Sequence, residues 1–280
     1  MRYLLFIYIS LHASLAKGQL DTIYTNKEKI ACSVKEVTPD AIQFTYPNET
    51  IVNSLYKNTI QKVVFRSGRT QVFSESSPLI EIDGIEDYGK VTITQVEGEL
   101  KGLYKIGEVS SSSRGGTAYS NVDRVKERAL NKLKMEAVMR GANLIYMAYQ
   151  KTEGNRYGGY FQSAKAAETI YSGVAYSNNL LKKQELIDRL SGADFLVSDK
   201  QIVLLKGMAI YKAEYSLEYI KTDIRILRVY EEGSQLFVEA KIRNFESSAF
   251  RVVRFNDSTF TLLAEDKNKI MNFIVPFKSQ

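Results

Sequence analysis

Histidine is almost absent from this chain of 280 residues. The only one, His12, lies in an N-terminal segment with the pattern of a signal peptide, so the rest of the chain contains none. Histidine is the general base of Ser-His-Asp and Cys-His sites and a usual ligand of zinc. Its absence excludes hydrolases of those designs. We predict that the protein is not an enzyme and that it holds no cofactor.

Cysteine is equally scarce, because Cys32 is the only one in the chain. A lone cysteine cannot form an internal disulfide, so stability must come from apolar burial and strand pairing. Cys32 alternates with Ile30 and Val34 in a strand-like pattern, and free cysteine is among the most buried residue types. We interpret Cys32 as a small buried hydrophobe. It also lies beyond the expected cleavage point, so we do not expect it to carry a lipid.

Long apolar runs are missing as well. The run from Tyr3 to Leu11 falls well short of the ~20 residues that a membrane-spanning helix needs, and no later stretch comes closer. It follows Arg2 and precedes Ala16 and Gly18, small residues that stand three and one positions before a possible cut. We therefore predict a signal peptide over residues 1–18, a periplasmic or secreted protein, and no transmembrane segment after signal removal.

The charge of the chain is mildly basic. Loss of Arg2 and Lys17 with the signal lowers the formal net charge from +6 to +4, and the remaining charges are spread out. Nucleic-acid binding would need a clustered basic footprint, so we expect no nucleic-acid partner. Weak attraction to anionic glycans or lipid headgroups is compatible with this charge.

Residues 19–75 show short strands separated by turns. Ile42, Phe44 and Tyr46 alternate with polar residues directly after a turn at Thr38-Pro39-Asp40. Alternation of this kind, repeated over several short runs, is typical of antiparallel sheets. We predict a small N-terminal β barrel or curled sheet.

The same segment is similar to a short β module near the start of many exported Bacteroidota proteins of unknown function. That module has a V-x-x-V-T-P-D-x-I turn and a closing I-x-x-V-x-F-x-x-G strand. The residues that carry the resemblance are Val34, Val37, Thr38, Pro39, Asp40, Ile42, Ile60, Val63, Phe65 and Gly68. The resemblance implies no known chemistry.

Residues 88–178 combine one helix with four strands. The helix is expected from Asn121 to Arg140, with a capping box at Ser120 and Asp123 and with Gly141 at its end. Its apolar stripe consists of Val122, Val125, Ala129, Leu133 and Ala137. The strands are expected at Val91–Val96, Leu103–Val109, Leu144–Tyr149 and Ile170–Tyr176. We predict a central ββαββ domain in which the helix covers a small sheet.

Part of this domain resembles the RcsF-like sensor domain of the outer-membrane lipoprotein of the Rcs stress response. The resemblance is carried by Ile106–Ser110, Gly141-Ala142-Asn143, Leu144–Tyr149 and Ser172–Tyr176. That family staples its domain with disulfides, whereas the aligned positions here hold Arg114, Gln150, Gly159 and Tyr171. The resemblance implies the fold. The family's sensing role depends on a lipid anchor and on partners that we do not expect for this chain.

Residues 179–280 begin with a helix expected from Asn179 to Leu190, which stops at Gly192. Strands dominate the remainder and are expected at Ile202–Leu205, residues 208–211, Thr222–Tyr230, Leu236–Asn244, Phe250–Phe255, Thr259–Leu263 and Ile270–Phe277. We predict a C-terminal antiparallel β meander or barrel. The fold class of the whole chain is α+β.

Positive charge recurs every fourth residue along the central helix, at Arg124, Arg128 and Lys132. An anionic partner could bind this face. However, Glu127 and Glu136 dilute its charge, and such a run on a helix is usually a solvated face.

A Gly-rich loop from Gly154 to Phe161 carries the aromatic residues Tyr157, Tyr160 and Phe161. Exposed aromatics on a loop are good contact residues for sugars or partner proteins. The alternative is that they fold back as a lid over the sheet. The loop lacks the glycine spacing of a phosphate loop.

These observations predict an exported cell-envelope protein that is a non-catalytic binding or sensing module, with an unknown envelope protein or a glycan as its partner. An alternative is a β-barrel carrier of an apolar ligand, if the C-terminal strands enclose a pocket. A glycosidase built on carboxylates is a third possibility, although its candidate acids resemble exposed loop residues. They are Glu81, Asp83, Glu86, Asp87, Glu231 and Glu232.

Overall fold

The computed structural model describes residues 20–25, 28–73, 79–210 and 215–277, and the predicted signal peptide lies outside them. The chain divides into two compact units, residues 1–78 and residues 79–280, which we describe separately. Both are built mainly from antiparallel strands, so the prediction of a β-rich chain is confirmed. Among the described residues, no helix is both long enough and apolar enough to cross a bilayer.

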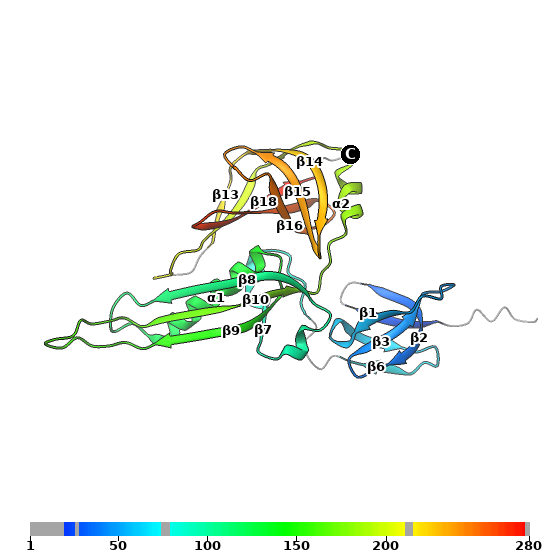
Figure 1. Cartoon of the computed structure of the whole chain (residues 1–280), viewed down its shortest axis with the longest axis horizontal. Coiled ribbons are helices and arrows are strands. Elements are labelled where there is room, and N and C mark those ends of the chain that lie inside the picture. Colours follow the sequence, from blue (N-terminus) through cyan, green and yellow to red (C-terminus); the bar gives the residue numbers. More distant parts are fainter. Residues whose placement is uncertain (1–19, 26–27, 74–78, 211–214, 278–280) are drawn as a thin grey trace, which may run out of the picture. The chain divides into compact units, whose positions relative to one another are not determined.

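The first unit holds a six-stranded antiparallel sheet (Figure 1). Its elements are β1 (Asp21–Thr25), β2 (Lys29–Val37), β3 (Ala41–Thr45), β4 (Asn53–Tyr56), η1 (Lys57–Thr59), β5 (Ile60–Val64) and β6 (Thr70–Val72). The order across the sheet is β4-β3-β2-β1-β5-β6, which leaves β4 and β6 at the edges. No pairing among the described strands joins these edges, so the sheet is open and the predicted barrel is not confirmed.

The core of the first unit is small and apolar. Its buried members are Ile23, Ile30, Cys32, Ile42, Phe44, Ile60 and Val63. Cys32 is fully buried among them, which confirms its interpretation as a small hydrophobe. Burial, with a smaller contribution from the nearby Asp21 carboxylate, raises the pKa of its thiol to about 11. Asp21 also ties two segments together, because it accepts hydrogen bonds from the backbone N–H groups of Val34 at 2.8 Å and Arg66 at 2.7 Å.

The second unit begins with a four-stranded sheet that is covered on one face by a helix. Its elements are η2 (Ile85–Lys90), β7 (Thr92–Thr94), η3 (Glu97–Leu100), β8 (Tyr104–Arg114), α1 (Val122–Met139), β9 (Leu144–Glu153) and β10 (Glu168–Ser177). The order is β7-β9-β10-β8, with β7 parallel to β9 and the other pairs antiparallel. The helix α1 packs against β8 and β10, so the expected helix-on-sheet layer is present.

The N-terminus of α1 differs from the prediction by one residue. The capping group is Asn121, whose side-chain oxygen accepts a hydrogen bond from the backbone N–H of Arg124 at 3.0 Å. The predicted cap, Ser120, instead accepts a hydrogen bond from the backbone N–H of Thr117 at 3.1 Å. The capping-box assignment was therefore wrong, because an asparagine beside the serine satisfies the first turn of the helix.

The other end of α1 is fixed by Gly141, as predicted. Its φ of 79° is in the left-handed region, which glycine adopts without strain. A Cβ at this position would lie 2.5 Å from the carbonyl oxygen of Val253, a residue of β16. Gly141 therefore both ends the helix and lets its end approach another strand closely.

The predicted apolar stripe of α1 faces the sheet. Four of its five members have no exposed surface, and these are Val125, Ala129, Leu133 and Ala137. Leu133 and Ala137 share a core with residues of β8, β9 and β10, such as Val109, Ile145 and Ala175. Apolar burial of this kind, and not intrinsic helix propensity, supplies most of the stability of a helix in a protein.

The rest of the second unit is an eight-stranded antiparallel sheet accompanied by one helix. Its elements are α2 (Lys183–Leu190), β11 (Phe195–Ser198), β12 (Lys200–Leu205), β13 (Tyr215–Glu218), β14 (Thr222–Glu232), β15 (Gln235–Ile242), β16 (Ala249–Phe255), β17 (Thr259–Glu265) and β18 (Lys269–Pro276). The order is β11-β14-β15-β16-β17-β18-β12-β13, with β11 and β13 at the edges. No described pairing joins these two strands, so an open sheet is found here too and closure into a barrel is not confirmed.

Two local expectations for this region were wrong. The helix α2 begins at Lys183, and Asn179 instead donates its backbone N–H to the hydroxyl of Ser177. The strand expected at residues 208–211 is reduced to a bridge between Ala209 and Ser113, with Tyr211 outside the described residues. The edge strand β11 was missed, since it contains only four residues.

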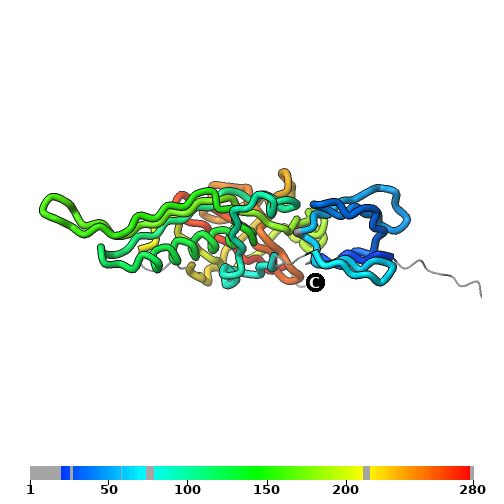
Figure 2. The backbone as a smooth tube through the Cα atoms, turned by 90° about the horizontal axis from the view of Figure 1, so that it is seen from below, coloured from blue at the N-terminus to red at the C-terminus, as the bar shows by residue number. Residues whose placement is uncertain are grey.

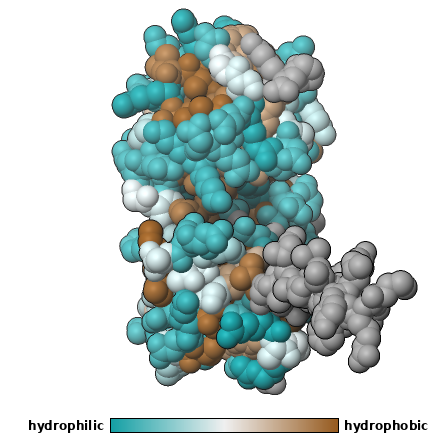
Figure 3. Space-filling model, turned by 90° about the vertical axis from the view of Figure 1, so that its right-hand side faces the viewer, coloured by the Kyte–Doolittle hydropathy of each residue, from teal (hydrophilic) through white to brown (hydrophobic). Residues whose placement is uncertain are grey.

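Two apolar cores stabilise the eight-stranded sheet. One lies between its strands and α2 and contains three fully buried phenyl rings, those of Phe250, Phe260 and Phe273. The other joins the sheet to α1, because Ile202 and Val253 belong to the same buried cluster as Leu133. On the face shown in Figure 3, the hydrophobic residues that reach the surface form separate patches among hydrophilic ones.

Candidate binding surface

The strands β9 and β10 continue as a hairpin that projects beyond α1 (Figures 1 and 2). Two backbone bridges extend their pairing, Arg156 with Lys165 and Gly159 with Gln162. The hydrogen bonds within these pairs measure 2.8 to 3.2 Å. We call residues 156–165 the hairpin tip. The loop expected between the two strands is therefore an ordered ribbon.

Two aromatic rings occupy the turn that closes the hairpin tip. Tyr160 is 98% exposed and Phe161 is 94% exposed, and their ring centroids lie 5.2 Å apart in an edge-to-face arrangement. We call them the turn rings. Tyr157 is 65% exposed and lies 5.3 Å from the ring of Tyr119. The three predicted contact residues are brought together, and none folds back as a lid over the sheet.

Asn155 fastens the base of the hairpin to the segment that leads into α1. Its side-chain amide donates to the carbonyl of Ser120 at 2.7 Å, and its side-chain oxygen accepts from the backbone N–H of Ala167 at 2.8 Å. The hydroxyls of Thr152 and Thr169 form a cross-strand hydrogen bond of 3.1 Å just below. These bonds hold the tip in one direction relative to the helix.

Three basic side chains surround one carboxylate between the tip and the sheet. Glu153 lies 2.5 Å from Lys165, 2.9 Å from Lys151 and 3.6 Å from Arg156. Hydrogen bonds from the two lysines lower the pKa of Glu153 to about 2. We call the three cations the basic collar. Glu168 is the direct cross-strand neighbour of Glu153, so the collar and these two acids together carry a formal net charge of +1.

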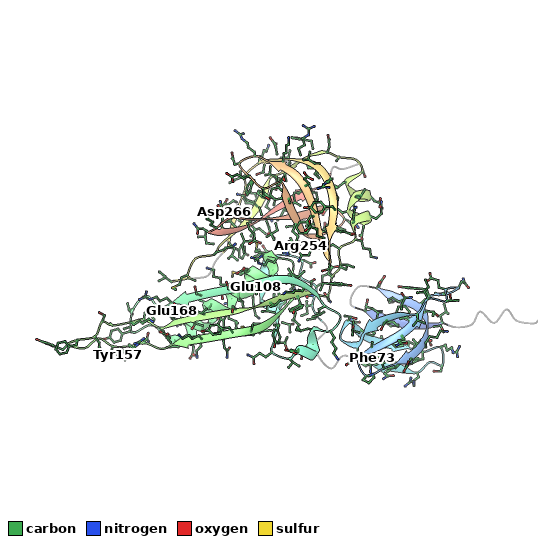
Figure 4. The ribbon with its side chains drawn as sticks, viewed as in Figure 1. Phe73, Glu108, Tyr157, Glu168, Arg254 and Asp266 are labelled. Carbon is green, nitrogen blue, oxygen red and sulfur yellow. The ribbon has the colours of Figure 1, made fainter. Side chains whose placement is uncertain are left out.

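The basic collar was not predicted from the sequence. Its signal is the placement of cations on both sides of the Gly- and Tyr-rich segment, which becomes a cluster only when the two strands pair. Figure 4 labels two residues of the hairpin, Tyr157 in the tip and Glu168 at the start of β10.

The predicted cationic face of α1 is divided between solvent and the interior. Arg124 is exposed. Arg128 donates to the hydroxyl of Ser113 at 3.1 Å and to the carbonyl of Arg114 at 3.1 Å. Lys132 is buried and donates to the backbone carbonyl of Gly207. Burial lowers the pKa of Lys132. Two of the three cations therefore bind the protein's own backbone.

A network of ion pairs connects α1 to the eight-stranded sheet and was not predicted. Arg140 binds both carboxylate oxygens of Glu265, at 2.7 and 2.9 Å, and one oxygen of Glu136, at 3.0 Å. Lys206 lies 2.9 Å from Glu265. Burial raises the pKa of Glu136, although Arg140 opposes the shift. Burial also acts to raise the pKa of Glu265, but Lys206 and Arg140 outweigh it and the pKa is lowered.

Two arginines of β16 reach into the same region. Arg251 donates to the carbonyls of Ile106 at 3.0 Å and Arg140 at 2.8 Å. Arg254 donates to the carbonyl of Val138 at 2.5 Å and lies between the eight-stranded sheet and α1 (Figure 4). Burial lowers the pKa of both guanidinium groups to about 10. The two side chains donate to backbone carbonyls of β8 and of the end of α1, so their role is structural.

A hollow of about 440 Å³ opens beside this network. Its charged lining consists of two acids and two cations, Glu108, Glu136, Arg140 and Lys206. A second hollow of about 300 Å³ is lined by residues that include Phe237, Arg251 and Glu265. Because the charges lining the first hollow balance, and its cations are already paired, it gives no preference for a ligand of either sign.

The candidate catalytic acids lie apart from both hollows. Asp87 pairs with Lys90 at 2.6 Å, and this hydrogen bond lowers its pKa. Asp87 also accepts the backbone N–H of Asp83 at 3.2 Å, and Glu231 accepts that of Lys183 at 3.2 Å. Within the described parts of the chain, no group of three or more His, Cys, Asp or Glu is placed to hold a metal ion. A lowered pKa keeps Asp87 ionised, which does not suit a general acid.

Comparison with known protein families, with curated proteins and with solved structures gave no match. The arrangement of the chain's own residues therefore carries the functional argument. The charged groups of the second unit hold its two sheets together, whereas the hairpin tip presents apolar rings to solvent. The tip is the described surface best suited to contact another molecule.

Proposed function

We propose that this chain is an exported, non-catalytic protein of the cell envelope that binds or senses another envelope component through the hairpin tip. The observation that carries the proposal is the exposure of Tyr160 and Phe161, at 98% and 94%, on an ordered ribbon. Aromatic side chains dominate binding energetics, and a surface that is ordered before binding loses less conformational entropy. The proposed partner is an envelope protein or a glycan.

Export belongs to the same proposal. The short apolar run after Arg2, followed by Ala16 and Gly18, supports a cleaved signal and a periplasmic or secreted location. The intact mass of the protein isolated from its host tests this, and we expect a chain that begins near Gln19 and carries no lipid. A retained N-terminus or an added acyl mass would overturn it.

The proposed likeness of residues 88–178 to the RcsF-like sensor domain is supported by the packing of α1 on the four-stranded sheet. A carrier with an apolar ligand inside the C-terminal sheet has less support, since Phe250, Phe260 and Phe273 occupy its interior. Native mass spectrometry tests the carrier alternative against the proposed binding role. A carrier should retain a small apolar molecule, and we expect none.

The binding role is tested by photo-crosslinking in the host. A photoreactive phenylalanine analogue replaces Tyr160 in one variant and Tyr219 in the control. Tyr219 is 76% exposed and follows β13 in the same unit, away from the hairpin. We expect a defined crosslinked partner from position 160 that is absent from position 219. Equal crosslinking at both positions, or none at either, contradicts the proposal, and turnover of a glycan library would replace it with an enzymatic function.

A further inference from the structure

The hairpin tip combines two features that suit a membrane surface. The turn rings form its end, and the basic collar lies behind them towards the sheet. From the Arg156–Lys165 pair to the turn, four residues at a rise of ~3.3 Å per residue give a separation of about 13 Å. Aromatic residues favour the boundary between headgroups and hydrocarbon, and cations favour anionic headgroups.

From this geometry we propose that the hairpin tip docks onto an anionic lipid surface, with the turn rings at the edge of the hydrocarbon and the basic collar facing the headgroups. The headgroup region is roughly 5–8 Å deep on each side of a bilayer. The charged ends of the collar meet at Glu153, three residues further from the turn than Arg156. An upright hairpin that places the turn rings below the headgroups therefore holds the collar above them, facing the charged surface. The inference rests on the proposed function, that the tip binds another envelope component, and it names a lipid surface as that component in place of a protein or a glycan.

The shape of the hairpin tip favours a lipid surface over a glycan or a protein partner. The turn rings meet at an interplanar angle of 73°, so the two together form no single flat platform for a glycan chain. Aromatic rings bury about 150–250 Å² each, so the pair supplies well under the ~800 Å² that a standard protein interface takes from one partner. A narrow ribbon with an apolar end needs no complementary surface to enter a lipid interface.

Charge supports the same choice. The basic collar holds three cations against two acids, Glu153 and its cross-strand neighbour Glu168, and the segment from residue 154 to residue 167 contains no further acid. Arg156 is the most exposed member, with 67% of its side chain accessible. A zwitterionic surface would gain little from this charge, whereas an anionic one attracts it in a salt-dependent way.

The absence of tryptophan from the chain provides a local reporter. The Phe161→Trp variant of the full chain is mixed with vesicles of phosphatidylcholine alone, or with about one third phosphatidylglycerol added to give a negative surface. We expect its emission to shift to shorter wavelength and to be quenched by brominated lipid only with the anionic vesicles. The matched control is Tyr219→Trp, whose emission we expect to stay unchanged. Every variant keeps the same N-terminal apolar run, so that run cannot produce the difference.

Binding strength is then measured by vesicle flotation. We expect Tyr160→Ser combined with Phe161→Ser to weaken anionic-vesicle binding at least about tenfold, because the apolar contribution is removed. Arg156→Gln is expected to weaken it about fivefold, and Arg124→Gln, which removes an exposed arginine from α1, less than twofold. Unchanged melting temperatures confirm that these variants remain folded.

Three results would overturn the lipid inference. They are no binding to anionic vesicles, equal binding by the double serine variant, and displacement by a soluble glycerophosphate, which would indicate a free anion as the ligand. A specific crosslink from position 160 to a protein or glycan, without vesicle binding, would overturn the lipid inference and leave the proposed function standing. If the protein neither binds anionic vesicles nor forms a specific crosslink from position 160, both the lipid inference and the proposed function are contradicted.

Discussion

Replacing Gly141 by alanine tests how α1 is joined to the eight-stranded sheet. Gly141 has a φ of 79°, and an added Cβ would lie 2.5 Å from the carbonyl oxygen of Val253. Gly192 offers a matched control in the same unit. Its φ is 76°, and a Cβ there would meet no atom within 4 Å. The two substitutions share the backbone penalty, and only one adds a steric clash.

The expected losses follow from these two contributions. A left-handed residue other than glycine costs about 1–2 kcal/mol, and the lower entropy of unfolded alanine returns about 0.4–1 kcal/mol. We therefore expect Gly192→Ala to lower the free energy of unfolding by at most about 1.6 kcal/mol. Overpacking against a backbone atom adds about 1–3 kcal/mol for Gly141→Ala. For a unit of this size, each kcal/mol corresponds to about 2–4 °C in melting temperature.

Urea unfolding of the two variants, followed by circular dichroism, measures the difference directly. We expect Gly141→Ala to be the less stable of the two by about 1–3 kcal/mol. Equal losses would show that the end of α1 does not approach β16 as closely as described. A smaller loss for Gly141→Ala than for Gly192→Ala would refute the reasoning altogether.

Four further outcomes are expected. Leu133→Asp should abolish the cooperative melting of the second unit, because it places a carboxylate in an apolar core, and a native melting temperature would contradict the orientation of α1. At pH 8 the Cys32 thiol should react with iodoacetamide roughly a hundredfold more slowly in the folded than in the urea-unfolded chain, and equal rates would contradict its burial. Because its folded pKa of about 11 lies above the unfolded value of 9.0, this thiol should reduce the stability of the first unit as the pH rises between those values. Asp21→Ala should cost the first unit about 2–5 kcal/mol in urea unfolding by leaving two backbone N–H groups without their acceptor, and Asp21→Asn should cost less.

The features of the fold that depend on neighbouring residues were predictable from the sequence. The stripe at Val125, Ala129 and Leu133 predicted the buried face of α1, and Gly141 predicted its end. Closure of a sheet depends instead on pairing between its two edge strands. Among the described strands, β4 does not pair with β6, and β11 does not pair with β13. Alternation within each strand carries no information about that pairing.

The same distinction explains what was predicted of the candidate site. Tyr160 and Phe161 were recognisable because aromatics in a Gly-rich segment are unusual and local. The roles of Arg128 and Lys132 depend on partners brought close only by folding, and a four-residue repeat of charge could not reveal that these side chains bind backbone carbonyls. The hydrogen bond from Asn155 to Ser120, which ties the base of the hairpin to the segment before α1, was equally hidden in the sequence.

The contrast between the charged network and the hairpin tip is the reason for placing the binding role at the tip. Arg140 and Lys206 are both paired with Glu265, so their charges are used in joining α1 to the eight-stranded sheet and in bracing that sheet. Burying an aromatic side chain of this size stabilises a fold by about 1.5–3 kcal/mol, and the fold forgoes that gain at both turn rings. The loss is considerable beside a net stability of about 5–15 kcal/mol for a typical domain. Holding these rings out on a braced ribbon has a physical rationale if they become buried in a partner, and none in the packing of the chain itself.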